Sequence, residues 1–159
     1  MQDKKIIYFI LFFLVLLIFG VSKIVGMNDK LTREYDELFI KYGLLYGIDP
    51  KILKAIALNE STLGKNKGYE PKGGTTGLMQ IKLSTARDFF PKLTAEELEK
   101  DEIQVMTASA FLASLKKTFK GDVKKMVMAY NQGAGATLNG KQYALGYWDK
   151  FQKHLNLVS

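Results

Sequence analysis

The chain has 159 residues, 47% apolar and 25% charged, which is ordinary for one globular domain and too short for two. It contains no cysteine, so disulfides and thiolate metal sites are excluded. The formal net charge is +7, of which residues 1–26 supply +2 (Lys4, Lys5 and Lys23 against Asp3) and the rest of the chain +5. A basic domain suits an acidic partner such as a nucleic acid, an anionic lipid surface or an anionic wall polymer. Scattered lysines also occur on a surface whose charge serves only solubility.

The N-terminal part of the chain is almost entirely hydrocarbon. Residues 6–25 are apolar apart from Ser22 and Lys23, and this stretch of about 20 residues is long enough to cross a bilayer as a helix. Lys4 and Lys5 precede it, which favours a cytoplasmic N-terminus and export of the rest of the chain.

This segment has three interpretations: an uncleaved signal anchor, a cleaved signal peptide or a buried core helix. Aromatic and branched side chains surround every face, which argues against a core helix. Residues 20–22 offer a small-residue cleavage site, but the run is long for a signal peptide core, so an anchor is favoured. We therefore expect a transmembrane anchor over 1–26 and one domain over 27–159, on the periplasmic side of the inner membrane, or secreted if the segment is cleaved.

The exported part reads as a series of helices. Apolar residues recur at helical spacing between positions 31 and 45, and Gly47 ends that helix. Asp49 before Pro50 is an N-cap followed by proline at the first helical position, which predicts a second helix reaching Glu60.

The remaining expected elements lie between residue 61 and the C-terminus. In chain order they are a long loop over 61–77, the sequence GLMQI at 77–81, a short helix from near Ser84, a capping box at Thr94 and Glu97, a long helix from about Glu102 to Phe119 that stops at Gly121, a helix capped by Asp122 that ends at NQGAG, and a last helix containing Tyr147, Trp148, Phe151 and Leu155. No alternating pattern of useful length appears, so the domain is predicted to be mainly α, with a small irregular strand region within 66–82.

Glu60 is the residue whose position raises a chemical question. It lies four residues after Ile56 and eight after Ile52, on the apolar face of its helix, and near the negative C-terminal end of the helix macrodipole. Burial and the dipole both raise the pKa of a carboxyl group. A carboxyl that stays protonated near neutral pH is what general-acid cleavage of a glycosidic bond requires. From spacing alone, a solvated glutamate at a frayed helix end is the commoner case.

Three short motifs in chain order change these odds. They are YGIDPKILKAIALNES (46–61), GLMQI (77–81) followed by Thr85-Ala86, and AYNQGAG (129–135) preceded by Gly121-Asp122. Together they resemble the lytic transglycosylase family, whose fold is that of goose-type lysozyme, and the resemblance covers about residues 36–153. The sequence YW (147–148) falls where the family has a tyrosine near the end of its domain.

The resemblance implies a reaction and a set of roles. Glu60 would be the sole catalytic acid and base, cleaving the β-1,4 bond between N-acetylmuramic acid and N-acetylglucosamine in peptidoglycan and leaving 1,6-anhydro-muramoyl ends. The residues implied around the glycan are Ser61, Met79, Gln80, Tyr130, Asn131 and Tyr147. Ser61, Met79 and Gln80 would line the cleft, Tyr130 and Asn131 would contact sugar and help orient Glu60, and Tyr147 would hydrogen-bond the Glu60 carboxyl.

The same resemblance implies neither a metal nor an organic cofactor. The implied partners are peptidoglycan strands, the membrane through the N-terminal helix and a secretion or cell-envelope complex, rather than nucleic acid. Several residues also have plainer interpretations: Met79 as core filler, Tyr130 as a structural ring and His154 as a surface residue. Lys65, Lys67 and Lys72 form a basic loop that would favour anionic wall components or would simply be soluble.

The sequence departs from the family pattern at a few places. Leu63 stands where a phenylalanine is common, Gln104 and Ala108 replace an asparagine and a glycine of the long helix, and the loop after Glu60 is about two residues longer. These changes put loop contacts and subsite preference in doubt rather than the chemistry at Glu60.

Three other functions stay open. Ordinary glycosidases use two carboxylates, and a hydrolytic muramidase on the same fold would need a second one from Asp49, Glu70 or Asp88. Asp49 looks committed to capping, and Glu70 is the best of the three. The chain could also be a non-catalytic glycan-binding component of a cell-envelope machine, or could disrupt membranes through its apolar segment alone.

Overall fold

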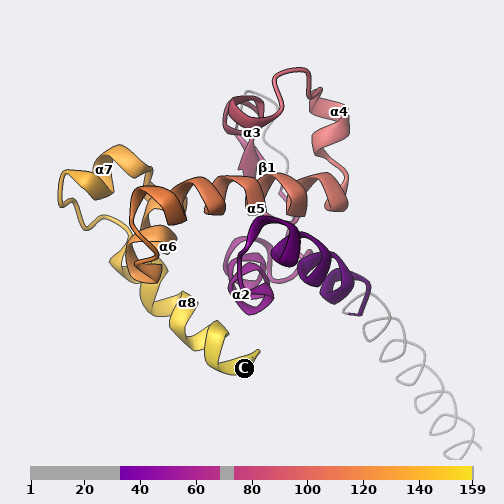
Figure 1. The fold of residues 1–159 in the computed structure, drawn as a ribbon. Helices are drawn as coiled ribbons and strands as arrows, with labels where there is room; N and C mark the ends of the chain where they lie inside the picture. The colour runs from indigo at the N-terminus through magenta and orange to yellow at the C-terminus, as the bar shows by residue number, and fades with distance from the viewer. Residues whose placement is uncertain (1–32, 69–73, 159) are drawn as a thin grey trace, which may run out of the picture. The chain divides into compact units, whose positions relative to one another are not determined.

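The computed structural model describes residues 33–68 and 74–158 (Figure 1). The predicted transmembrane segment and the predicted boundary at residues 26 and 27 lie outside the described residues. Within the described part, no helix combines the length and the apolar character needed to cross a membrane. Asp36–Ser159 forms one compact unit.

This unit is mainly helical, as predicted. Residues 36–46 are helical. The elements after this helix are α2 (Pro50–Ser61), β1 (Thr75–Thr76), β2 (Ile81–Lys82), α3 (Leu83–Phe89), α4 (Ala95–Leu98), α5 (Asp101–Thr118), α6 (Val123–Gln132), α7 (Ala134–Leu138) and α8 (Leu145–Leu157). The predicted start of α3 and both predicted ends of α5 were correct to within one residue.

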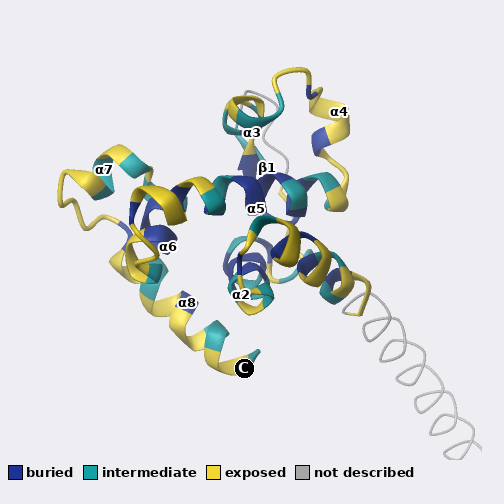
Figure 2. Ribbon diagram, viewed as in Figure 1, coloured by how far each residue is buried: buried dark blue, intermediate teal, exposed yellow. Residues whose placement is uncertain are grey.

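Helix α5 is the core of this unit. It packs against α2, α3, α4, α6 and β2, and dark blue buried segments mark it in Figure 2. Small buried residues, Ala108, Ser109 and Ala110, let neighbouring backbones approach, while Leu112 and Leu115 fill the space further along. Helix α2 packs closely against α8, which brings the C-terminal region of the domain beside Glu60.

The predicted helix caps are confirmed. The Asp49 carboxylate accepts from the Lys51 N–H, the Asp122 side chain accepts from the Lys125 N–H, and Thr94 with Glu97 forms a complete capping box. These contacts satisfy amide groups that a helix leaves without an internal partner. Asp49 is therefore committed to capping, as the sequence indicated.

The predicted strand region is a two-residue antiparallel hairpin. Thr75 pairs with Lys82 and Thr76 with Ile81. Gly77 opens the turn with φ +78°, and a Cβ atom there would lie 2.7 Å from the Cδ atom of Gln104. Glycine is required at this position by both the backbone angle and the close approach of α5.

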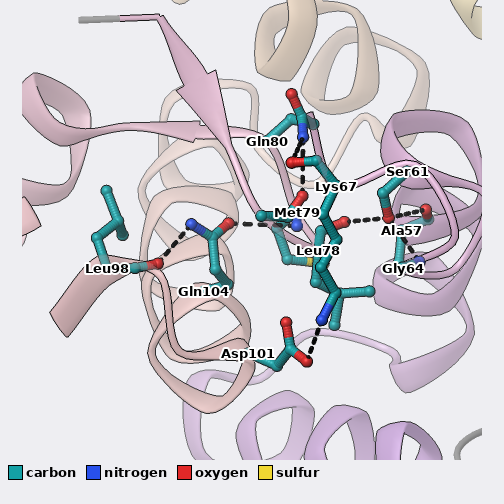
Figure 3. A network of polar contacts seen from close by, with 11 residues as sticks. Ala57, Ser61, Gly64, Lys67, Leu78, Met79, Gln80, Leu98, Asp101 and Gln104 are labelled. Carbon is teal, nitrogen blue, oxygen red and sulfur yellow. Dashed lines mark hydrogen bonds and ion pairs between the residues drawn. The ribbon is translucent and has the colours of Figure 1, made fainter. Parts of the chain in front are cut away.

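Gln104 supports the turn from behind (Figure 3). It is fully buried, its Oε1 accepts from the Met79 N–H at 3.2 Å, and its Nε2 donates to the Leu98 carbonyl at 2.8 Å. One side chain therefore joins the hairpin, α4 and α5. In the sequence, Gln104 is only a departure from the family pattern. In the structure, its side chain joins the hairpin to α4.

Candidate active site

An open pocket of about 280 Å³ lies where α2, the hairpin, α3, α5 and α6 meet. Its lining residues are Glu60, Thr75, Gln80, Ile81, Lys82, Thr85, Phe111, Tyr130, Asn131, Gln132 and Gly133. Four of the predicted site residues, Glu60, Gln80, Tyr130 and Asn131, are among them. Segments separated by about 70 residues of chain thus converge on one cavity, as the order of the motifs implied.

Glu60 is the penultimate residue of α2. The helix ends in a left-handed turn at Thr62 and Leu63, with φ of 54° and 55°, and their N–H groups bond back to the Leu58 and Ala57 carbonyls. This turn directs the chain away and leaves the Glu60 side chain at the wall of the pocket.

Opposing effects act on the Glu60 carboxyl. Burial raises its pKa above the ordinary value and is the largest cause, while a hydrogen bond from Tyr147 and the positive charge of Lys150 lower the pKa by less. The net direction is upward. A raised pKa keeps a larger fraction of the group protonated near neutral pH, which is the state of a general acid.

Tyr147 reaches Glu60 from α8. Its hydroxyl donates to Glu60 Oε1 at 2.6 Å, the contact that the family resemblance implied. Burial, followed by the nearby Glu60 charge, raises the pKa of Tyr147 well above its ordinary value, so the phenol keeps its proton and acts as the donor. Because Oε1 accepts this bond, the proton of the neutral carboxyl belongs on Oε2.

Tyr130 forms another wall of the pocket. Its hydroxyl donates to the Met79 carbonyl at 2.8 Å, and burial raises its pKa well above the ordinary value. The ring lies 5.4 Å from the ring of Phe111, which in turn lies 6.1 Å from that of Phe89. Tyr130 therefore lines the pocket and also braces the hairpin, which agrees with its structural interpretation, and its contact with sugar stays a prediction.

The family resemblance implied that Ser61 and Met79 line the cleft, and the structure places both side chains outside the lining of the described pocket. Both are buried, with exposures of 1% and 0%, and neither belongs to the pocket lining. The Ser61 hydroxyl donates to the Leu78 carbonyl at 2.7 Å and accepts from the Gly64 N–H (Figure 3). The Met79 side chain packs in the core. Both residues therefore support the segments that form the pocket wall without lining the pocket.

Gln80 lies in the lining, but its amide is already engaged. Its Nε2 donates to the Lys67 carbonyl at 3.1 Å (Figure 3) and to the Gly77 carbonyl at 2.9 Å. Its Oε1 accepts from the Thr75 hydroxyl. An amide nitrogen has only two hydrogens, so neither is left for a ligand. The oxygen keeps one accepting position.

A second set of contacts fixes the end of α2 against α8. Asn59 Nδ2 donates to the Tyr147 carbonyl at 3.1 Å, and its Oδ1 lies 2.6 Å from His154 Nδ1. Lys150 Nζ donates to the Asn59 carbonyl at 3.0 Å. His154, expected at the surface, is half-buried and belongs to this network beside the Glu60–Tyr147 pair.

The carboxylates considered as partners of Glu60 are distributed elsewhere. Asp49 caps α2, Asp88 is exposed on α3 and does not line the pocket, and Glu70 lies outside the described residues. Of the described residues that line the pocket, Glu60 is the one carboxylate.

The basic loop proposed from the sequence is only partly described. Lys67 forms an ion pair with Asp101 at 2.6 Å, which ties the loop to the start of α5. Lys65 is exposed, and Lys72 lies outside the described residues.

Sequence reasoning missed Lys82 and Phe111. Lys82 directly follows GLMQI, and this position next to a family motif was the signal that could have marked it as a pocket residue. Phe111 lies in the middle of a long helix, where spacing does not distinguish a core ring from one that faces a cavity.

Comparisons with known proteins concern the family and the fold of the chain. Residues 37–151 match the family described as Transglycosylase SLT domain. Endo-type membrane-bound lytic murein transglycosylase A from Klebsiella pneumoniae subsp. pneumoniae and the protein of the same name from Salmonella paratyphi B are each 32% identical over 123 residues, which cover 69% of this chain and 60% of the relative. The chain thus spans about 60% of the length of these relatives.

A solved structure shares the fold. The structure of an inactive mutant of lytic transglycosylase Slt from Pseudomonas aeruginosa matches with a TM-score of 0.57 and 20% identity, over 77% of this chain and 22% of that one. At this identity the likeness concerns the fold, which is that of the predicted lysozyme-like class.

Proposed function

The chain belongs to the Transglycosylase SLT domain family, and on this basis we propose that it is a peptidoglycan lytic transglycosylase with Glu60 as its single acid and base. The observation that carries the proposal is the environment of the Glu60 carboxyl. It lines the pocket, burial raises its pKa, and Tyr147 holds one of its oxygens at 2.6 Å.

The first step is protonation of the leaving group. Neutral Glu60 donates its proton to the oxygen that bridges N-acetylmuramic acid and N-acetylglucosamine, and the C1–O bond of the muramoyl unit breaks. The acetamido group of the substrate stabilises the positive charge that develops at C1. Glu60 is left as a carboxylate, which the Tyr147 hydrogen bond and the Lys150 charge stabilise.

The second step closes the sugar on itself. The Glu60 carboxylate takes the proton from the muramoyl C6 hydroxyl while O6 bonds to C1, so the product is a 1,6-anhydro sugar and no water is consumed. Glu60 regains its proton and is ready for another cycle. The absence of a second carboxylate among the described lining residues supports this route over one that activates water.

Asn131 and Tyr130 are the proposed sugar contacts. Asn131 is exposed at the C-terminal end of α6 and brings a donor and an acceptor to the pocket. The rings of Tyr130 and Phe111 supply an apolar surface for a sugar face. Gln80 acts mainly by fixing the hairpin that carries the neighbouring wall, because its amide hydrogens are used within the protein.

We further propose attachment to the cytoplasmic membrane through the apolar segment 6–25, with the domain on the outer side. The names of the relatives describe those proteins as membrane-bound. Fractionation of cells that express the full chain, with protease added to spheroplasts, tests this topology: the domain is expected in the membrane fraction and to be digested from outside.

The deciding experiment for the reaction is mass spectrometry of peptidoglycan digested by the full chain in detergent. Anhydro-muramoyl ends are expected, and they are lighter than hydrolysed ends by the mass of one water molecule. Glu60→Gln is expected to abolish product, while Glu97→Gln, an exchange of the same kind in the exposed capping box, should retain it. Reducing ends would instead identify a hydrolytic muramidase, and undiminished cleavage by Glu60→Gln would refute the role of Glu60.

A further inference from the structure

The lining of the pocket includes a lysine side chain that the proposed chemistry does not use. Of its described lining residues, only Glu60 and Lys82 carry acidic or basic side chains. Lys82 is the last residue of β2 and precedes α3, and it is exposed at the pocket wall. It is placed by the same hairpin that Gln80 and Gln104 hold rigid.

Within residues 33–68 and 74–158, the ammonium of Lys82 has no ion-pair partner. Lys41, Lys54, Lys67 and Lys125 are all engaged in ion pairs, and Lys150 bonds to a backbone carbonyl. For Lys82, no ion pair or hydrogen bond from the side chain is found among the described residues.

Glu60 does not neutralise this charge. The cation that affects the Glu60 carboxyl is Lys150, on α8, and Lys82 is not among the groups that shift its pKa. Lys82 and Glu60 therefore line one pocket without forming an ion pair with each other. Of the described lining residues, Lys82 is the one with a basic side chain, and it is the positive group that the pocket wall presents to a ligand.

We propose that Lys82 is a specificity-determining residue that binds a carboxylate of the peptide stem carried by the muramoyl unit. This inference rests on the proposed function, since it names the form of the substrate that the same site recognises. The glycan backbone offers hydroxyl and acetamido groups, whereas the stem supplies carboxylates, and an unpaired ammonium at the pocket wall complements the latter. The chain accordingly favours strands with charged stems over strands whose stems are neutral.

The test compares native walls with walls whose carboxylates have been converted to amides by carbodiimide and ammonia. Lys82→Met removes the charge with little change in side-chain length, Lys82→Arg keeps the charge, and Lys92→Met removes an exposed lysine outside the pocket. Lys82→Met is expected to raise KM on native walls about two- to fivefold with kcat unchanged, and to have no effect on amidated walls. Lys82→Arg and Lys92→Met should match the parent chain on both.

Binding is measured separately from cleavage. In the Glu60→Gln background, co-sedimentation with native and amidated walls should show the same loss of about two- to fivefold for Lys82→Met, on native walls only. Equal effects of Lys82→Met and Lys92→Met, or a Lys82→Met effect that persists on amidated walls, would overturn the inference even if glycan cleavage is intact. If cleavage is absent while the binding difference remains, the proposed reaction fails and the recognition of carboxylates by Lys82 stands.

Discussion

Replacing Glu60 by glutamine should make the folded domain more stable at neutral pH while it abolishes cleavage. The pKa of Glu60 is raised in the fold because burial disfavours the carboxylate. The unfolded chain ionises its glutamates with an ordinary pKa of about 4.3. As pH rises from that value to the raised value, the unfolded state gains a charge that the folded state resists, so the stability contributed by neutral Glu60 is lost. Glutamine stays neutral and avoids this loss.

The slope of the effect is set by linkage. One proton separates the two states in the window between the unfolded and the folded pKa, so the stability of the parent chain relative to Glu60→Gln falls by at most about 1.4 kcal/mol per pH unit. Above the folded pKa the difference is constant. Below about pH 4 both chains are neutral at this position, and the difference there reports only the exchange of a hydroxyl for an amide group beside Tyr147.

The measurement is denaturant unfolding of the full chain in detergent, between roughly pH 2.5 and pH 8, so that it extends below the ordinary carboxyl pKa of about 4.3. The single tryptophan, Trp148, is a suitable fluorescent reporter because it lies on α8 and stacks on Phe151. Glu102→Gln is the control of opposite sign, because hydrogen bonds from Lys41 and Tyr42 lower the pKa of Glu102. Its loss should destabilise the domain fully above the ordinary carboxyl pKa, and this effect should disappear as the pH falls through the lowered pKa. A difference between parent and Glu60→Gln that does not change with pH would refute the claim that Glu60 is desolvated.

Two further predictions concern neighbours of this site. Tyr147→Phe should move the alkaline limb of the pH–rate profile to higher pH, because the hydrogen bond that it removes lowers the Glu60 pKa. The kcat should fall roughly tenfold, because Glu60 loses orientation and its carboxylate loses stabilisation. An unmoved alkaline limb would contradict the assignment of this limb to Glu60. Gly77→Ala should lower the free energy of unfolding by about 1–3 kcal/mol in a urea titration, because the new Cβ would clash with Gln104 and the backbone has φ +78°. Gly140→Ala, at φ +71° with open space around it, should lower it by less. Equal losses would exclude a contribution from the clash with Gln104.

Local signals account for the parts of the fold that the sequence predicted. The caps at Asp49, Thr94 and Asp122 depend on one or two side chains bonding to amides within three residues, so a short stretch of sequence is sufficient to recognise them. Helix α7 lacks such a signal and was missed. Its region is fixed by Gln132, whose side chain bonds to Thr137, to the Lys141 carbonyl and to the Ala144 N–H, contacts that spacing alone does not reveal.

The order of the motifs predicted which segments meet at the site, but not which side chains face the cavity. Glu60 and Ser61 are adjacent on α2, and consecutive helical residues point about 100° apart, so one reaches the pocket while the other turns to the Leu78 carbonyl of the hairpin. In the hairpin, likewise, the Met79 side chain is buried whereas Lys82 lines the cavity. A motif records that a residue type is needed, and this need is as strong for a hydroxyl that joins α2 to the hairpin as for a group that touches sugar. Substitution at Ser61 is therefore expected to change activity by moving Glu60 against its wall rather than by removing a glycan contact.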